Sequence, residues 1–494
     1  MDLTSFMFIC FYAALLVLYY IVPGKLQWML LLAFSLLFYL QSGSPVLVLY
    51  PFAAVLVSYV CGKNIEKAQQ AGDTRLAKHI LLTDLFLLIG CLALLKYLKL
   101  GSGGGLSLPL GLSFYTFTLA GYAADIYNGI GQSAPSFAGL LTYGMYFPVM
   151  TSGPIMKYRE SGGQFYERHA FNYDHFTKGL QRMLYGFFKK LVISARAGTV
   201  CSEIFRNYEN YSGIYIWIGA LMFTFQLYTD FSGCMDIVIG LSETLGITLP
   251  ENFRTPFFSK SIAEYWRRWH ITLGVWMREY VFYPLLRSSL FTKIAKVFRE
   301  KFGKKRGKQY TTFLAMAVLW FTVGLWHGGA LKYLIGSGML HWFYIVAGEV
   351  TLPFWKRTLP KLHIPMEGKF ADGFRILRTF FLVNIGNVFF NANSAKAGAL
   401  MLAAGWKLGN IAALWNGGML ELGLDRIEWC VLIVSLLILL AVSLLQEKGS
   451  VRDRIAALPV VIRFALWMVF LFYVIILGEY GPGYTASEFI YADF

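Results

Sequence analysis

The chain has 494 residues, of which 57% are hydrophobic and 15% are charged, and its mean hydropathy is +0.53. This composition excludes a set of soluble globular domains and indicates a protein that lives in a lipid bilayer. Lys and Arg exceed Asp and Glu by 44 − 28 = 16. In a membrane protein such an excess first reports topology, and because no nucleic-acid-binding motif accompanies it, nucleic acid is not an expected partner.

Apolar stretches recur along the whole chain. A helix needs roughly 20 apolar residues to cross the bilayer, because lipid offers no hydrogen-bond partners to the backbone. The stretches are 3–22, 26–40, 46–61, 80–100, 110–127, 138–156, 179–197, 213–247, 311–326, 333–350, 377–390, 397–414, 427–445 and 460–477. We predict ten to thirteen crossings in one membrane domain over 1–494, with N-terminal spans in 1–100, a catalytic core in 101–350 and C-terminal spans in 351–494.

Basic residues of short loops predict the orientation. Lys25 and the loop 63–79 fall on the same side, which should be the cytoplasm and leaves the N-terminus outside. The strongest basic block, 287–308, holds nine Lys and Arg residues and one acid, Glu300. It is interpreted as a cytoplasmic loop facing anionic lipid; the alternative is a site for the phosphates of a cofactor.

His327 is the sharpest catalytic candidate among the seven histidines. It follows Trp326 and precedes Gly328, and no other residue of 319–330 is ionisable. Desolvation disfavours the charged imidazole, and a neutral imidazole is what a general base requires. Gly328 would let a substrate approach the ring closely. The alternative, a core histidine bonded to a neighbouring helix, is equally compatible with the sequence.

His341 lies fourteen residues after His327. On one continuous helix the two rings would share a face but lie about 21 Å apart. They can serve one substrate only if the chain breaks its helix near Gly328. Zinc motifs place two histidines one turn apart, so a metal pair is not expected and His341 is interpreted as structural or as a supporting residue.

The segment 259–273 ends in a basic and aromatic cluster that includes Arg267, Arg268 and His270. Aromatic and apolar residues recur there at steps of three and four: Trp266, Trp269, Leu273, Trp276 and Tyr280. This spacing predicts one amphipathic helix at the headgroup level, with guanidinium groups toward phosphate. By itself, His270 would then be part of an interfacial anchor.

Two carboxylates, Asp230 and Asp236, interrupt an apolar stretch. Charges are costly in lipid, so each needs a partner such as Arg or Ser, and a role in organising the fold is expected. All six cysteines occur singly, and no Walker loop, H-E-x-x-H or G-x-S-x-G motif is present. We therefore expect no metal site and no bound cofactor.

Several motifs in chain order resemble those of bacterial membrane-bound O-acyltransferases, in particular the branch of the alginate O-acetylase membrane component and related polysaccharide O-acetylases. The motifs lie at 111–117, 147–154, 228–240, 251–257, 266–273, 325–328 and 489–494. The resemblance implies an all-α polytopic membrane protein, in which a ring of tilted helices surrounds a central funnel and interfacial helices lie beside it. It covers most of the chain.

The resemblance also implies the site. His327 corresponds to the essential histidine of the family, and His270 stands where related eukaryotic acyltransferases carry an Asn or Asp, which implies a second catalytic residue. Further substrate contacts are expected from the residues around these two: Trp326, Gly328, Trp269, Arg267, Arg268 and His341. In the mechanism that we hypothesise, the basic block 287–308 together with Arg267 and Arg268 would hold the phosphates of the donor.

By the same resemblance, acetyl-CoA is the expected cytoplasmic donor and an extracytoplasmic polysaccharide the final acceptor. A separate extracytoplasmic partner protein would complete the transfer, and the protein would lie in the bacterial cell membrane.

Three alternatives remain open at this point. D-alanyl transfer to teichoic acid, from an acylated carrier protein, fits the same histidine, although its enzymes tend to be shorter. A secondary transporter could use Asp230, Asp236 and His327 as coupling groups, but the sequence shows no two halves with matching broken helices. A scaffold would tolerate the loss of His327.

Overall fold

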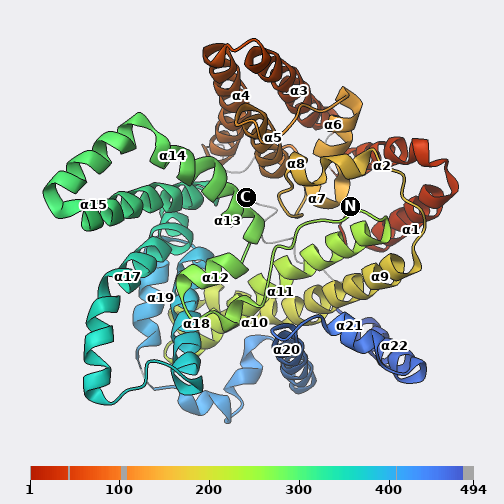
Figure 1. Ribbon diagram of the computed structural model, residues 1–494. Helices are drawn as coiled ribbons and strands as arrows, with labels where there is room; N and C mark the ends of the chain where they lie inside the picture. Colours follow the sequence, from red (N-terminus) through yellow and green to blue (C-terminus); the bar gives the residue numbers. More distant parts are fainter. Residues whose placement is uncertain (1, 43–44, 102–107, 408, 482–494) are drawn as a thin grey trace. The chain divides into compact units, whose positions relative to one another are not determined.

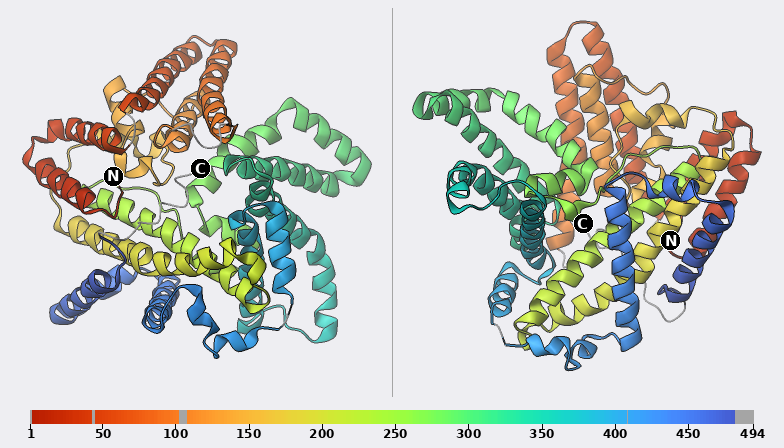
Figure 2. Two further views of the ribbon diagram at one scale, coloured as in Figure 1. Left: turned by 180° about the vertical axis from the view of Figure 1, so that it is seen from behind. Right: turned by 60° about the horizontal axis from the view of Figure 1, so that its bottom comes forward.

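A computed structural model describes residues 2–42, 45–101, 108–407 and 409–481 (Figures 1 and 2). Within these residues nearly every element is a helix, and one isolated antiparallel bridge joins Phe253 to Trp269. The prediction of an all-α fold is confirmed. The C-terminal motif 489–494 lies outside the described residues.

In the part of the chain that the structure describes, six helices are long and apolar enough to cross a membrane, and we treat the chain as a multi-pass membrane protein. They include α2 (Gln27–Ser42), α3 (Leu49–Gln70), α4 (Thr74–Gly101), α15 (Ser289–Trp326), α20 (Arg426–Gln446) and α22 (Val460–Leu477). Only 6% of the apolar window of α22 is buried, as expected of a helix whose solvent is lipid. Two apolar helices, α1 (Phe6–Ile21) and α19 (Ala395–Gly405), are shorter. The higher number of ten to thirteen crossings stays a prediction.

The remaining helices are shorter, more buried or more polar. They are α5 (Leu112–Tyr127), α6 (Phe137–Gly144), α7 (Phe147–Met150), α8 (Tyr158–Ser161), α9 (Tyr173–Phe187), α10 (Ala195–Arg206), α11 (Ile214–Thr244), α12 (Ile262–Arg268), α13 (Ile271–Met277), α14 (Tyr283–Arg287), α16 (Leu331–Tyr333), α17 (Leu340–Thr358), α18 (Lys369–Asn391) and α21 (Val451–Ala456). Three π-helical segments, Phe188–Ser194, Arg278–Phe282 and Leu334–Met339, follow α9, α13 and α16.

The chain divides into two compact units. The first comprises Met1–Leu191, Asp230–Glu251 and Arg452–Asp493; the second comprises Val192–Thr229, Asn252–Val451 and Phe494. Both candidate catalytic histidines belong to the second unit. The predicted division at 100 and 350, and the predicted funnel, stay predictions.

Paired glycines bring α9 close to α11 in the first unit (Figure 1). A Cβ atom on Gly179 would lie 2.5 Å from the carbonyl oxygen of Gly240, and one on Gly240 would lie 2.5 Å from that of Gly179. Gly186 and Gly233 repeat the arrangement, at 2.6 and 2.9 Å, seven residues along each helix. Small residues at such positions let helix backbones approach closely, which is how helices associate in lipid.

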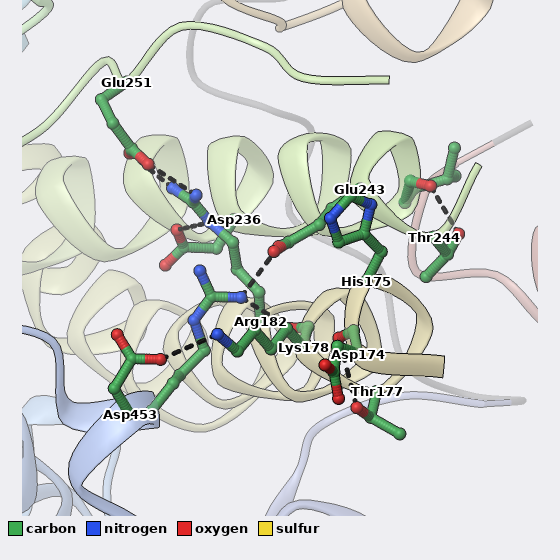
Figure 3. Close-up of polar contacts among 12 residues, drawn as sticks. Asp174, His175, Thr177, Lys178, Arg182, Asp236, Glu243, Thr244, Glu251 and Asp453 are labelled. Atoms are coloured by element: carbon green, nitrogen blue, oxygen red, sulfur yellow. Dashed lines mark hydrogen bonds and ion pairs between the residues drawn. The ribbon is translucent and has the colours of Figure 1, made fainter. Parts of the chain in front are cut away.

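This close approach places opposite charges in contact (Figure 3). Arg182 bonds Asp236 through Nε at 3.0 Å and Glu251 through its terminal nitrogens at 2.6 and 2.7 Å. Two lysines complete the set: Lys189 Nζ lies 2.5 Å from Asp236, and Lys190 Nζ lies 2.5 Å from Asp230. The prediction that Asp230 and Asp236 need polar partners is confirmed, and their role in organising the fold stays a prediction.

In the second unit, α15 is two helices joined at Gly303, whose backbone (φ 79°, ψ 162°) is not helical. The two limbs, 289–302 and 304–326, meet at this turn and diverge from it in Figures 1 and 2. Gly307 permits the close approach of the two limbs next to the turn, because a Cβ atom there would lie 2.5 Å from the backbone nitrogen of Arg299. All nine basic residues of the block 287–308 are exposed, and six of them lie within five residues of Gly303: Arg299, Lys301, Lys304, Lys305, Arg306 and Lys308.

Candidate active site

His327 lies where α15 ends. It is the C-cap of the helix, and its backbone N–H still bonds the carbonyl of Val323 at 3.1 Å. The helix stops there because Gly328 and Gly329 take positive φ values of 149° and 72°, a region that glycine enters readily. The His327 side chain is 2% exposed, which agrees with the predicted burial.

Two aromatic rings surround the imidazole of His327. The ring of Trp326 lies 4.7 Å from it between centroids, and that of Phe390 on α18 lies 5.3 Å away, both near edge-to-face. A Cβ atom on Gly328 would lie 2.7 Å from the Tyr333 ring. Because Gly328 has no side chain, the ring of Tyr333 can lie next to the backbone beside His327. The space next to this glycine is thus filled by Tyr333.

The chain then returns through a π-helix, Leu334–Met339, whose glycines pack on two helices. A Cβ on Gly336 would lie 2.7 Å from the carbonyl oxygen of Gly386 on α18, and one on Gly338 would lie 2.8 Å from that of Trp320 on α15. The segment from His327 to His341 is thus broken rather than one helix. The helix break near Gly328, without which His327 and His341 could not serve one substrate, is therefore present.

His341 is 4% exposed and lies among aromatic rings. Its imidazole centroid is 4.9 Å from that of Trp266 and 5.7 Å from that of Trp320, and its N–H bonds the carbonyl of Gly336. On α18 it faces Gly386, one turn before the Phe390 that contacts His327. These contacts favour a packing role for His341 beside the site.

His270 is placed differently from the expectation. Helix α12 ends at Arg268, His270 has a left-handed backbone (φ 47°, ψ 51°), and α13 begins at Ile271. The prediction of one continuous interfacial helix is wrong. Instead of an exposed anchor, His270 is a buried residue, 2% exposed, held between two short helices.

The break at His270 has a backbone cause. Phe253 forms the isolated bridge with Trp269, and two hydrogen bonds flank it: Arg254 N–H to the carbonyl of Arg268 at 2.9 Å, and Ile271 N–H to the carbonyl of Asn252 at 3.0 Å. These bonds occupy groups that a continuous helix would use for itself. We call the paired segments 252–255 and 268–272 the clasp.

Burial lowers the pKa of His270 to about 3. The residue lies outside the six candidate spans, and desolvation acts on it because the charged imidazole loses its hydration. The ring is therefore neutral near pH 7, the form that can accept a proton.

Trp326 joins the two histidines. Its ring centroid is 4.7 Å from that of His327 and 6.1 Å from that of His270. Two histidines that are 57 residues apart in the chain, 327 − 270, thus lie around one indole. Trp269 packs against other rings. Its ring centroid lies 5.5 Å from that of Tyr265, in a stacked arrangement, and 5.0 Å from that of Phe253, edge-to-face.

The two arginines after Trp266 differ. Arg268 is bound by Glu264 at 2.9 Å and by Glu447 at 2.6 Å, so its charge is already balanced. Arg267 is exposed. The assignment of both to donor phosphates stays a prediction, and this geometry favours it only for Arg267.

Sequence reasoning missed three kinds of residue around the site. Asn252 contacts His270 directly, and Phe390 contacts His327. On α18, Asn384 accepts a bond from the Thr224 hydroxyl at 2.8 Å and Asn387 donates one to it at 2.9 Å, which ties α18 to α11. Amides inside apolar helices were a usable signal, because side chains that hydrogen-bond across helices are selected in lipid.

The fold is that of a polytopic membrane protein, and two buried histidines lie near one indole of its second unit. The chain belongs to the MBOAT, or membrane-bound O-acyltransferase, family, whose model matches residues 130–391. It is an O-acyltransferase, and the match includes both His270 and His327.

Curated relatives are similar over much of the chain. A probable alginate O-acetylase of Azotobacter vinelandii is 30% identical over 410 residues, which are 80% of this chain and 75% of the relative. The peptidoglycan O-acetyltransferase of Helicobacter pylori is 28% identical over 60% of this chain and 56% of its own. The teichoic acid D-alanyltransferase of Bacillus subtilis is 29% identical over 47% and 56%.

Proposed function

We propose that the protein moves an acetyl group from a cytoplasmic thioester donor, acetyl-CoA, across the membrane for O-acetylation of an extracytoplasmic polysaccharide. The observation that carries this proposal is the convergence of two buried histidines on Trp326. The names of the relatives with the longer matches, alginate and peptidoglycan acetylases, support acetyl as the acyl group and a polysaccharide as the acceptor.

In the proposed reaction, His327 acts as general base. It takes the proton of an acceptor hydroxyl while the hydroxyl oxygen attacks the thioester carbonyl carbon. The tetrahedral intermediate then collapses, the carbon–sulfur bond breaks, and the proton passes to the leaving thiolate. General base catalysis of this kind contributes about 10²- to 10⁴-fold, and bringing donor and acceptor together supplies the remaining orientation.

The surroundings of the histidines suit this chemistry. Trp326 is 9% and Phe390 6% exposed, so the imidazoles are bordered by apolar rings that exclude water. Exclusion of water protects a thioester from hydrolysis and strengthens the interactions of a developing charge. The acceptor that receives the group is proposed to be a separate extracytoplasmic partner protein, which passes it to the polysaccharide.

The test is acetyl transfer by the protein in proteoliposomes, with labelled acetyl-CoA on one side and, on the other, a soluble polysaccharide together with an extract of extracytoplasmic proteins that supplies the acceptor partner. We expect His327→Ala to lower the rate by at least about 10²-fold, the lower end of a lost general base, while folding and insertion are retained. His79→Ala is the matched control, because His79 is exposed on α4. Wild-type activity in His327→Ala would reject the assignment.

D-alanyl transfer is the second candidate, supported by the similarity to the Bacillus subtilis enzyme. The same proteoliposomes distinguish the donors, since only this function would consume an acylated carrier protein and leave acetyl-CoA unused. Movement of an intact substrate without any acyl transfer would instead support a transporter.

A further inference from the structure

Asn252 lies at the centre of the clasp and is fully buried, at 0% exposed. Its side-chain oxygen Oδ1 lies 3.2 Å from Nδ1 of His270, 3.1 Å from the backbone nitrogen of Thr272 and 2.9 Å from the Thr272 hydroxyl. One amide oxygen therefore makes three polar contacts, one with His270 and two with Thr272.

The orientation of this amide follows from the backbone. The N–H of Thr272 can only donate, so the atom of Asn252 that faces it must be the oxygen and not the NH₂ group. A flipped amide would set two donors against each other. The oxygen, in turn, can only accept from the ring of His270. Nδ1 of His270 must therefore carry the hydrogen.

We infer that Asn252 is a positioning residue that fixes neutral His270 as the Nδ1–H tautomer, with Nε2 as its hydrogen-bond acceptor. A neutral imidazole carries one hydrogen, so fixing it on Nδ1 leaves the lone pair on Nε2. The left-handed backbone of His270, at φ 47°, belongs to the same arrangement. A strained backbone of this kind persists where surrounding contacts over-determine it.

The tautomer decides what His270 can do, and this step rests on the proposed function. An Nε2 lone pair accepts a hydrogen bond from the acceptor hydroxyl, or its proton, but donates nothing to an oxyanion. His270 therefore orients or helps to deprotonate the nucleophile, and the developing oxyanion must be stabilised by other groups. The uncharged state of the ring agrees with this role, because burial lowers the pKa of His270.

The first test needs no acyl transfer. The full-length protein is labelled with ¹⁵N-histidine, reconstituted in lipid at pH 7 and measured by solid-state NMR. The signal of His270 is assigned by its absence from His270→Gln. We expect a protonated Nδ1 and an unprotonated Nε2. A protonated Nε2, or a doubly protonated ring, would overturn the inference while leaving the proposed function untouched.

The second test compares three variants in the transfer assay and in the NMR measurement. Asn252→Ala removes the acceptor, and we expect kcat to fall at least about tenfold with KM within about twofold, since a misplaced base loses part of its 10²- to 10⁴-fold contribution. Asn252→Asp keeps an oxygen facing Nδ1, so it should retain the Nδ1–H signal and restore part of kcat. Thr272→Val removes only one donor and should stay within about threefold of wild type.

The outcomes separate the two claims. A wild-type kcat in Asn252→Ala, or equal losses in Asn252→Ala and Thr272→Val, would reject the positioning role. If Asn252→Ala does not fold, the tautomer of the wild-type protein, together with the Nδ1–H signal and the kcat of Asn252→Asp, still tests the positioning role. If the tautomer is found as expected but His270→Gln transfers acetyl at the wild-type rate, the role of His270 in transfer is rejected while the inference about the tautomer stands. If the wild-type protein transfers no acetyl group at all, the proposed function fails and the tautomer is unaffected.

Discussion

His341 has the contacts of a packing residue rather than a reacting one. It is held by a hydrogen bond to Gly336 and by two indole rings. We predict that His341→Phe, which keeps an aromatic ring but loses the bond, lowers stability by about 1 kcal/mol, the typical net value of one hydrogen bond, and keeps transfer within about threefold.

The same exchange at His327 provides the comparison. His327→Phe should abolish transfer with a similar change in thermal unfolding, measured by fluorescence of the solubilised protein. If His341→Phe loses as much activity as His327→Phe without greater loss of stability, His341 contacts substrate and the packing role is wrong.

The sequence was informative about His327 because one ionisable residue in an apolar run has few explanations. It was misleading about His270, since the spacing from Trp266 to Tyr280 fits a helix on its own. What breaks that helix is the bridge to Phe253, a pairing with a segment more than ten residues earlier in the chain. Local periodicity carries no information about such a pairing. For the same reason, the contact between Asn252 and His270 could not be predicted from the sequence.

At the scale of elements, the position of the charges on α9 and α11 depends on the paired glycines. Gly179 faces Gly240, and Gly186 faces Gly233. A Cβ atom on any of the four would lie 2.5–2.9 Å from the carbonyl oxygen of the glycine that it faces. We predict that Gly240→Ala destabilises the protein by about 1–3 kcal/mol, the usual cost of overpacking, because its Cβ would lie 2.5 Å from a carbonyl oxygen that belongs to a helix backbone.

Gly90→Ala on α4 is the matched control, since no atom lies within 4 Å of its added Cβ. Alanine also has the higher helix propensity, so this variant should be neutral or slightly more stable. Thermal unfolding in one detergent compares the two. Equal melting temperatures for both variants would show that α9 and α11 do not depend on this contact.

The partners of Asp230 and Asp236 were predictable in kind but not in identity. A buried carboxylate demands a donor or a cation, and Lys190, Lys189 and Arg182 supply it. Which basic residue pairs with which acid depends on the rotation and register of α9 against α11, and these are set by the seven-residue spacing of the glycines on both helices. That reciprocal spacing is present in the sequence but is recognisable only once the two helices are known to be neighbours.

At the scale of the whole molecule, charge and apolar length together predict the sidedness on which the transfer proposal depends. The nine basic residues of 287–308 are exposed, six of them lie within five residues of the turn at Gly303, and the second limb of α15 continues from there as an apolar stretch. The positive-inside rule predicts a cytoplasmic location for this turn and, separately, for the turn between α3 and α4. By the same rule the segment before α3 is expected outside.

We predict the corresponding pattern of cysteine labelling in sealed, right-side-out vesicles, in a background where the six native cysteines are replaced. Val46→Cys, at a site 67% exposed just before α3, should react with an impermeant maleimide added outside. Ala71→Cys and Arg306→Cys, both at exposed sites, should react only after the vesicles are opened. Labelling of Arg306→Cys from outside would place the basic turn on the acceptor side, and a cytoplasmic acetyl-CoA could then not be held by it. The labelling pattern therefore also tests whether the basic turn can hold a cytoplasmic donor, independently of any residue at the site.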